Sequence, residues 1–300
     1  MSLIVTSLPA YVEQNREELI AKAVLNARTA SIINYQTGIK TSAAINLLST
    51  DVKFGDGLTC GFDAAGSQEL SQRVIETGAV KVNMEYCDKS LLKTFAQYGV
   101  RVAADGEKTL PFEEKFIGSV VENVKAAIEK AVWQGDKASE DENLNKFDGL
   151  IKILGAAEGV ITASGANSDV FAALQDVLVK LPATAIKEDT RIFVGTDTFM
   201  RLVNELVSAN LYHYSADADN YELVMPGTTI KVTAVDGLNG TNKVIAGRAS
   251  NFFYGTDLEG DEERFDFWYS KDDRMFKLAI EFNAGVQVAY PDEVVVLTLA

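Results

Sequence analysis

The sequence predicts an α+β fold in which strands from distant parts of the chain pair with one another. Three observations predict it. β-prone runs dominate residues 31–86 and the C-terminal quarter of the chain. Amphipathic stretches of helical periodicity lie before and between these two regions. The sequence contains no internal repeat, which would have indicated a repeat protein instead. Hydrophobic residues make up 47% of the 300 residues, which is enough for a large packed core and too many for a disordered chain.

The first helix is expected over residues 9–28, because apolar residues recur there at helical spacing and Pro9 suits a first turn. Residues 31–86 then carry short β-prone runs on both sides of a glycine-rich stretch at residues 54–61. From residue 80 to 86 apolar and polar residues alternate, as in a half-buried strand. This region predicts a long two-stranded excursion with a flexible tip.

Two helices are expected next. A short helix covers residues 88–98, where Gly99 can end it. The second is the longest in the chain. It starts in the turn that holds Pro111, carries an apolar stripe along one side, and ends near Trp133 where Gly135 follows.

A helix–strand–helix block follows an acidic loop. Its helices are expected over residues 167–181 and 196–210, with a strand at residues 191–195 between them. Short polar side chains accept hydrogen bonds from the free N–H groups at a helix start. On this basis the N-cap candidates are Asn167 or Ser168 for the first helix, and Thr196 or Asp197 for the second.

The C-terminal part is predicted to be mostly β. Alternating or β-branched runs favour six strands. They are expected at residues 229–235, 243–248, 265–269, 274–282, 287–289 and 294–298.

Charge and the scarce residue types exclude several classes of protein. The 28 basic and 43 acidic residues give a net charge of −15, which disfavours sequence-independent binding of nucleic acid. No apolar run approaches the ~18 residues of a membrane span, and the N-terminus has no signal-peptide pattern. One histidine, His213, and two cysteines, Cys60 and Cys87, are too few for a zinc site. So few cysteines suggest a reducing compartment, and a Cys60–Cys87 disulfide is the less favoured alternative.

Four patterns approach known chemical motifs, and each departs from its motif. The glycine-rich run at residues 55–61 places its third glycine one position too far for a dinucleotide loop. Ser90 and Lys93 fit SxxK without the companion motifs. Residues 217–220 lack the glycine of a calcium loop, and the acidic residues at 256–274 are typical of a solvated or inter-subunit surface. We therefore predict no catalytic residues, no metal, no cofactor and no enzyme.

Three short motifs stand in a distinctive order along the chain. The long helix ends in Trp-Gln-Gly-Asp at residues 133–136, Asn-Lys-Phe-Asp-Gly-Leu follows at 145–150, and the final strand begins with Ala-Tyr-Pro-Asp-Glu-Val-Val-Val at 289–296. Together with the order of the elements, these motifs resemble the major capsid proteins of tailed bacteriophages with the Hong Kong 97 fold. The resemblance spans nearly the whole chain.

This resemblance implies a division of the α+β chain into the segments of a Hong Kong 97-like capsid protein. They are an N-terminal arm at 1–30, an extended β loop at 31–80, a peripheral domain around the long spine helix at 81–148 with 240–283, and an axial domain at 149–239 with 284–300. The extended loop would lie over a neighbouring subunit. A long two-stranded arm cannot bury itself on its own domain, which is consistent with such a role.

The same resemblance implies which residues meet other subunits. They belong to the tip of the extended loop, the tip of the peripheral domain and the loop near the capsomer axis. The expected interface residues are Phe54, Leu58 and Phe62 in the first, Lys271, Asp272, Asp273 and Arg274 in the second, and Tyr212 and Tyr214 in the third.

The function implied is that of a structural subunit of an icosahedral phage head. Copies of the chain would self-assemble into pentamers and hexamers that enclose double-stranded DNA without sequence-specific binding. The implied partners are the chain itself, a portal protein, and separate scaffold and decoration proteins, with no membrane. The implied location is the virion, after assembly in the cytoplasm of the bacterial host.

Two alternatives stay open at this point. An encapsulin-like nanocompartment shares the fold and would enclose a cargo enzyme in place of DNA. A soluble α+β enzyme with an acidic metal-dependent site would form a small defined oligomer instead of a shell.

Overall fold

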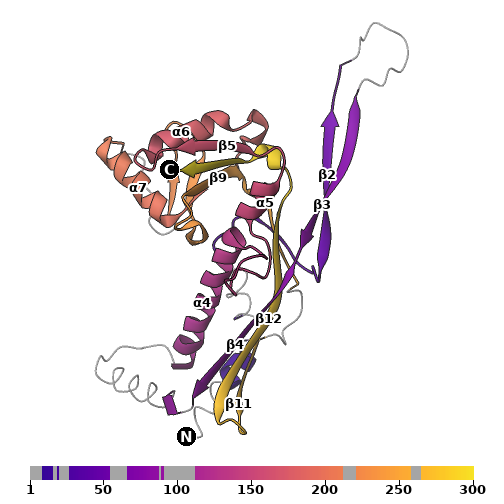
Figure 1. Cartoon of the computed structure of the whole chain (residues 1–300), viewed down its shortest axis with the longest axis vertical. Coiled ribbons are helices and arrows are strands. Elements are labelled where there is room, and N and C mark those ends of the chain that lie inside the picture. Colours follow the sequence, from indigo (N-terminus) through magenta and orange to yellow (C-terminus); the bar gives the residue numbers. More distant parts are fainter. Residues whose placement is uncertain are drawn as a thin grey trace.

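The computed structural model describes residues 9–15, 19, 27–54, 66–87, 89–90, 112–211, 221–257 and 265–300. Figure 1 shows two lobes joined along the helix α4 (Phe112–Gln134), and a two-stranded hairpin that projects away from both. One lobe is built on a five-stranded sheet and the other on a six-stranded sheet. The hairpin forms a third, separate sheet.

The five-stranded sheet packs against the N-terminal part of α4. Its longest strand, β12, pairs with β11 and β4 along one half and with β10 along the other, and β1 adds to β10 in parallel. The strands are β1 (Asn34–Gln36), β4 (Gly78–Cys87), β10 (Phe252–Thr256), β11 (Phe265–Ser270) and β12 (Met275–Val288).

The six-stranded sheet has the order β5-β13-β9-β6-β8-β7 and mixes parallel with antiparallel pairs. Two helices, α6 and α7, cover one of its faces, while α5 follows α4 on the other side (Figure 1). The strands are β5 (Ile161–Gly165), β6 (Thr190–Val194), β7 (Glu222–Val224), β8 (Lys231–Ala234), β9 (Lys243–Arg248) and β13 (Val295–Leu299). The helices are α5 (Leu150–Ala156), α6 (Val170–Lys180) and α7 (Thr196–Ser208).

Short 3₁₀ turns connect several of these elements. They are η2 (Ala183–Ala185), η3 (Asp236–Leu238), η4 (Ala249–Asn251) and η6 (Pro291–Glu293). Two of them, η4 and η6, lie where the chain crosses from one sheet to the other.

Each lobe has its own hydrophobic core. The larger core lies between α4 and the five-stranded sheet and reaches the near face of the six-stranded sheet through Trp133 and Phe193, whose ring centroids are 5.3 Å apart. The second core lies between α6, α7 and the far face of that sheet. Because Trp133 is fully buried at the end of α4, this helix holds the two lobes together.

The longest helix and most strands lie where the sequence predicts them. The predicted helix ending near Trp133 is α4, and the predicted strand at residues 243–248 is β9. Of the first predicted helix, residues 9–14 are helical and most of the remainder lies outside the described residues. The helix predicted at 88–98 is described only at residues 89–90, which are helical.

Three expectations were wrong in detail. Helix α6 begins at Val170, and its N-cap is Asp169, one residue after the candidate Ser168; Asp169 accepts a hydrogen bond from the N–H of Ala172 at 3.0 Å. The N-cap of α7 is Gly195, which makes no side-chain cap. The strands predicted at 274–282 and 287–289 are one continuous strand, β12.

Candidate functional site: the hairpin and the junction that supports it

Strands β2 (Ser42–Asp51) and β3 (Ser67–Glu76) pair in antiparallel register from Ser42 opposite Glu76 to Asp51 opposite Ser67. Residues directly opposite each other share one face of a two-stranded sheet, and successive residues alternate between faces. The register therefore assigns each side chain of the hairpin to an inner or an outer face.

The inner face packs on the body of the same chain. Ile45, Leu47 and Ile75 are buried there in a small cluster with Ile39 and Ala289. This contact uses the half of the hairpin that is nearer its root.

The outer face is bare, and exposed apolar side chains lie on it among the uncharged polar residues Asn46, Thr50, Gln68 and Gln72. Leu48 and Leu70 lie directly opposite each other on it, with side chains 51% and 77% exposed, and Val74 on the same face is 50% exposed. Val52 and Phe54, which follow β2 toward the tip, are 69% and 99% exposed. Single exposed hydrophobic residues are ordinary, but several on one face of a strand pair make that face a candidate interaction surface.

The root of the hairpin is held in a fixed position by close backbone contacts. A Cβ atom on Gly285 of β12 would lie 2.1 Å from the carbonyl oxygen of Glu76, and one on Gly78 would lie 2.0 Å from that of Lys146. The amide of Gln287 donates to the carbonyl of Val74 at 2.7 Å. These contacts fix the root of the hairpin against β12 and against the loop that holds Lys146.

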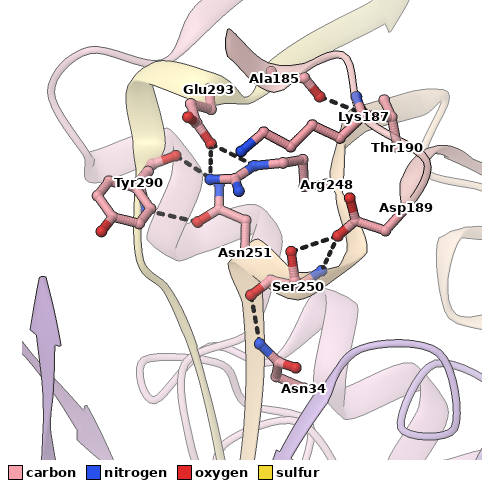
Figure 2. Close-up of polar contacts among 10 residues, drawn as sticks. All are labelled: Asn34, Ala185, Lys187, Asp189, Thr190, Arg248, Ser250, Asn251, Tyr290 and Glu293. Atoms are coloured by element: carbon pink, nitrogen blue, oxygen red, sulfur yellow. Dashed lines mark hydrogen bonds and ion pairs between the residues drawn. The ribbon is translucent and has the colours of Figure 1, made fainter. Parts of the chain in front are cut away.

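Close to the root, the chain crosses between the two sheets at two places, which Figure 2 shows. One crossing runs from β9 through η4 to β10, and the other from β12 through η6 to β13. The side chain of Asn251 joins the two crossings. Its NH₂ group donates to the backbone carbonyl of Tyr290 at 2.7 Å, and its side-chain oxygen Oδ1 accepts from the backbone N–H of Tyr290 at 2.6 Å. Asn251 is 1% exposed, so both hydrogen bonds are shielded from water.

Charged side chains flank this link on its six-stranded side (Figure 2). The guanidinium of Arg248 is ion-paired with Glu293 through Nε at 2.8 Å and through Nη2, and it stacks 5.9 Å from the ring centre of Tyr290. Asp189 accepts hydrogen bonds from the N–H of Ser250 at 3.2 Å and from its hydroxyl. Partial burial raises the pKa of Asp189, but the hydrogen bonds from Ser250 outweigh it, and the net pKa lies below its ordinary value.

A third polar contact fixes the segment that precedes β1 to the spine helix. Glu129, on α4, is buried and accepts from the N–H of Thr29 at 3.0 Å and from the hydroxyl of Thr29. The indole N–H of Trp133 donates to the same hydroxyl oxygen at 2.7 Å. Burial raises the pKa of Glu129 above its usual range, and the hydrogen bonds from Thr29 only partly offset that effect.

The residues predicted to meet other subunits are placed as follows. Phe54 lies at the distal end of the described part of the hairpin. Lys271, Asp272, Asp273 and Arg274 form the exposed turn between β11 and β12, at the end of the first lobe that is remote from the hairpin. In that turn a hydrogen bond from Lys277 lowers the pKa of Asp273, and Arg274 has a positive φ of 54°. Leu58, Phe62, Tyr212 and Tyr214 lie outside the described residues, so their role stays a prediction.

The chemical motifs yield no reactive arrangement within the described part of the chain. No group of three or more histidine, cysteine or acidic residues that could hold a metal ion occurs there. In the acidic region at 256–274, the buried Asp257 accepts from the N–H and side-chain amide of Asn283, at 2.7 and 2.6 Å. The thiol of Cys87 is free and exposed, and Cys60 and His213 lie outside the described residues. No described helix is long and apolar enough to cross a membrane.

Comparison with known proteins finds likeness at the level of structure. No protein-family model matches the chain, and no curated protein matches it in sequence. The capsid of an empty GTA particle matches with a TM-score of 0.55 at 14% identity, over 93% of this chain and 90% of that one. The procapsid of satellite phage P4, which includes a size determination (Sid) protein, matches with 0.56 at 12%, over 94% and 90%. The capsid of Myoviridae phage XM1 matches with 0.54 at 12%, over 94% and 91%.

These matches extend over both lobes and the hairpin, since they cover more than nine-tenths of the chain. The chain has the fold of phage capsid proteins, and the α+β, Hong Kong 97-like fold expected from the sequence is confirmed.

Proposed function

We propose that this chain is the structural subunit of an icosahedral phage head and that its copies self-assemble into the pentamers and hexamers of a closed shell. One observation carries the proposal: the hairpin projects away from its own body with exposed apolar side chains along its outer face, in a fold shared with capsid proteins. A second copy of the chain is the partner that a shell supplies for every such face.

The sheets suggest how the domains of such a subunit are divided. The five-stranded sheet with α4 is the peripheral domain, and the six-stranded sheet with α5, α6 and α7 is the axial domain. We draw the boundaries at the two crossings, residues 249–251 and 289–294, because β9 belongs to the six-stranded sheet and β12 is continuous to Val288. These boundaries lie after 240 and 284, the positions that the sequence suggests, by about nine and five residues. The hairpin is the extended loop, and residues 1–30 are the N-terminal arm.

In this function the chain is not an enzyme and needs no cofactor. Its partners are other copies of itself, a portal protein at one vertex, and separate scaffold and decoration proteins where the phage uses them. The net charge of −15 supports a shell that encloses DNA without binding it, because an acidic wall repels phosphate. The virion is the final location of the protein, after assembly in the bacterial cytoplasm.

Sedimentation of the purified protein, followed by analysis of what the particles contain, tests this proposal. A shell subunit sediments far faster than a 32.6 kDa monomer, in one narrow boundary. Phage heads made during infection yield DNA and a portal protein, whereas an encapsulin-like compartment yields a cargo enzyme. A small oligomer whose activity depends on a divalent ion would contradict the proposal and favour the enzyme alternative.

A further inference from the structure

The segment at residues 27–33 lies where the two lobes meet and contacts both of them. Thr29 is bonded to Glu129 on α4 through its backbone N–H and its hydroxyl. The preceding residue, Arg28, is half-buried, and its guanidinium lies 5.8 Å from the ring centre of Tyr221, just before β7 of the six-stranded lobe. Two adjacent residues therefore tie this segment to both lobes.

The apolar contacts of this segment are small. Among residues 27–31, the buried apolar side chains are those of Ala27 and Ala30. An alanine buries only one methyl group, so it contributes much less to packing than a leucine or a phenylalanine does. The position of the segment therefore depends strongly on the hydrogen bonds between Thr29 and Glu129.

The carboxyl group of Glu129 is enclosed by its neighbours. Glu129 is 4% exposed, and Thr29, which covers it, is fully buried. η3 packs directly on the same turn of α4, because a Cβ atom on Gly237 would lie 2.3 Å from the carbonyl oxygen of Glu129 and 2.3 Å from Cδ1 of Trp133. An ionised carboxylate in such a place loses most of its hydration, and this loss costs far more than it does for a neutral carboxyl group.

Titratable groups from other described parts of the chain face Glu129, and their effects differ in sign. Arg28, in the docked segment, favours the ionised form, whereas Asp236, in η3, disfavours it. Tyr254, in β10, is fully buried, and burial raises the pKa of its hydroxyl, so it stays neutral. Burial is the largest effect on Glu129 and raises its pKa above the usual range. Glu129 therefore ionises at a higher pH than an exposed glutamate does.

We propose that Glu129 is a proton-controlled latch: as a neutral carboxyl group it holds residues 27–33 between the two lobes, and its ionisation releases them. The sign follows from the linkage of protonation to docking. A group that is harder to ionise while the segment is docked favours docking at low pH, and this contribution is lost as the pH rises. Release also withdraws Arg28 from Tyr221, so one ionisation loosens the segment from both lobes.

Hydrogen exchange at the docked segment tests the latch in the full-length chain. The N–H of Thr29 is itself donated to Glu129, so its exchange with deuterium reports whether the contact is closed. Protection is the ratio of the rate expected for an unstructured peptide to the measured rate, which removes the ordinary effect of pH on exchange. In the natural sequence, protection of the peptide that contains Thr29 should fall at least tenfold between about pH 5 and about pH 9, while circular dichroism stays constant.

Two glutamine variants separate the latch from other effects of pH. Glu129→Gln keeps a hydrogen-bonding side chain that cannot ionise, so the protection of the segment should stay constant within about twofold over the same range. Glu122→Gln is the matched control on the same helix, because Glu122 is exposed and its pair with Lys125, at 3.6 Å, lies on the surface. It should show the same fall in protection as the natural sequence.

Fluorescence of Trp133 gives a second readout that needs no change at Glu129. The chain has two tryptophans, so Trp268→Phe leaves Trp133 as the one that remains. The indole N–H of Trp133 donates to the hydroxyl of Thr29 at 2.7 Å, and its emission should therefore shift over the pH range in which protection is lost. Adding Thr29→Val weakens docking and removes a hydrogen bond from the ionised carboxylate, so this transition should move to lower pH.

These outcomes require no measurement of assembly, so the latch and the shell function stand or fall separately. A loss of protection with rising pH that Glu129→Gln prevents supports the latch. Protection that is constant in the natural sequence, or that increases with pH, overturns it. An equal loss in Glu129→Gln assigns the effect to another group and also overturns the latch. If Glu129→Gln does not fold, the fluorescence transition decides, and a midpoint that Thr29→Val leaves unshifted overturns the latch.

Discussion

The carboxylate of Glu129 accepts a hydrogen bond from the backbone N–H of Thr29 at 3.0 Å, joining two residues that are 100 positions apart in the sequence. The contact is fully enclosed, since Thr29 is 0% and Glu129 is 4% exposed. A buried carboxylate is costly unless it is well hydrogen-bonded. Its presence on the spine helix therefore indicates that the segment at residues 27–33 has a specified position on α4.

The Thr29–Glu129 contact predicts a pH dependence that Glu129→Gln removes. Burial raises the pKa of Glu129, so its contribution to stability is fully present below the unfolded value of about 4.3 and is lost as the pH rises through the folded pKa. A glutamine accepts from the Thr29 N–H and donates to its hydroxyl without a charge. Measured by urea unfolding, the stability of the variant relative to the natural protein should therefore rise with pH.

The control for this experiment is Glu122→Gln on the exposed side of α4, where the carboxylate is only in a surface pair with Lys125 at 3.6 Å. Such a pair is worth ~0–1 kcal/mol, and its loss should add little pH dependence between pH 5 and 8. A relative stability of Glu129→Gln that falls with increasing pH would show that the carboxylate is stabilised as an anion.

Tyr254→Phe should leave the subunit equally stable or make it more stable. Tyr254 is fully buried, and its hydroxyl has no hydrogen-bond partner among the described residues. Removing an unsatisfied buried hydroxyl relieves a cost of ~1–3 kcal/mol while the ring keeps its packing. The midpoint of thermal unfolding measures the change, and a loss of more than about 1 kcal/mol would reveal a partner for this hydroxyl.

Asn251→Ala should destabilise the subunit by about 2–4 kcal/mol. The change removes two hydrogen bonds and leaves the N–H and carbonyl of Tyr290 without their partner at a buried site. Asn46→Ala is the matched control, because Asn46 is exposed on the hairpin and only accepts from Gln72 at 2.8 Å. Denaturant unfolding should show a much larger loss in the free energy of unfolding for Asn251→Ala than for Asn46→Ala. Equal losses would mean that the link between the crossings is not important for stability.

Replacing residues 54–66 by a short Gly-Ser turn should abolish assembly and leave the fold intact. Phe54 is 99% exposed, so its removal costs the isolated subunit almost no packing, whereas a neighbour that covers it gains about 1.5–3 kcal/mol. Circular dichroism and thermal melting of the subunit should be nearly unchanged, and electron microscopy should show no closed particles. Normal shells from this variant would show that the hairpin is not an inter-subunit element.

Assembled particles should tolerate salt at neutral pH. Exposed ion pairs are screened within ~8–10 Å at physiological ionic strength, and they contribute little. Beyond the root, the paired positions of the outer face of the hairpin instead carry no charge, and Leu48, Leu70 and Val74 are exposed along it. Light scattering of the particles at 0.1 and 1 M salt checks this prediction. Dissociation of mature particles at the higher concentration would show that ion pairs hold the subunits together.

The parts of the fold that the sequence predicted have strong local signals. Helix α4 has an uninterrupted apolar stripe, and β9 is a run of β-prone residues with clear ends. The missed elements depend on distant partners. α5 is only seven residues long, and β5 consists mostly of small residues that form a strand because β13 pairs with them in parallel.

Strand β12 shows why the predicted boundary inside it was wrong. The residues Asn283, Ala284 and Gly285 have low strand propensity, and the sequence suggests a break there. The close approach of the Glu76 carbonyl requires a glycine at that place, and pairing with β10 and β4 keeps the strand intact.

The same reasoning applies to the candidate site. Phe54 could be predicted, because an apolar residue beside a glycine-rich turn has no core of its own to enter. The outer face could not be predicted, because it depends on the register that puts Leu48 opposite Leu70. Glu129 did leave a signal, as an acidic residue among the apolar positions of α4, but its partner Thr29 lies too far along the chain to be deduced.

Electron microscopy of the purified, negatively stained protein shows whether this chain forms a shell. We expect closed particles of uniform diameter with fivefold vertices, formed by this chain alone or with a scaffold protein expressed beside it. Monomers or small open oligomers under both conditions, from protein that is folded by circular dichroism, would contradict the assignment of this chain as a shell subunit.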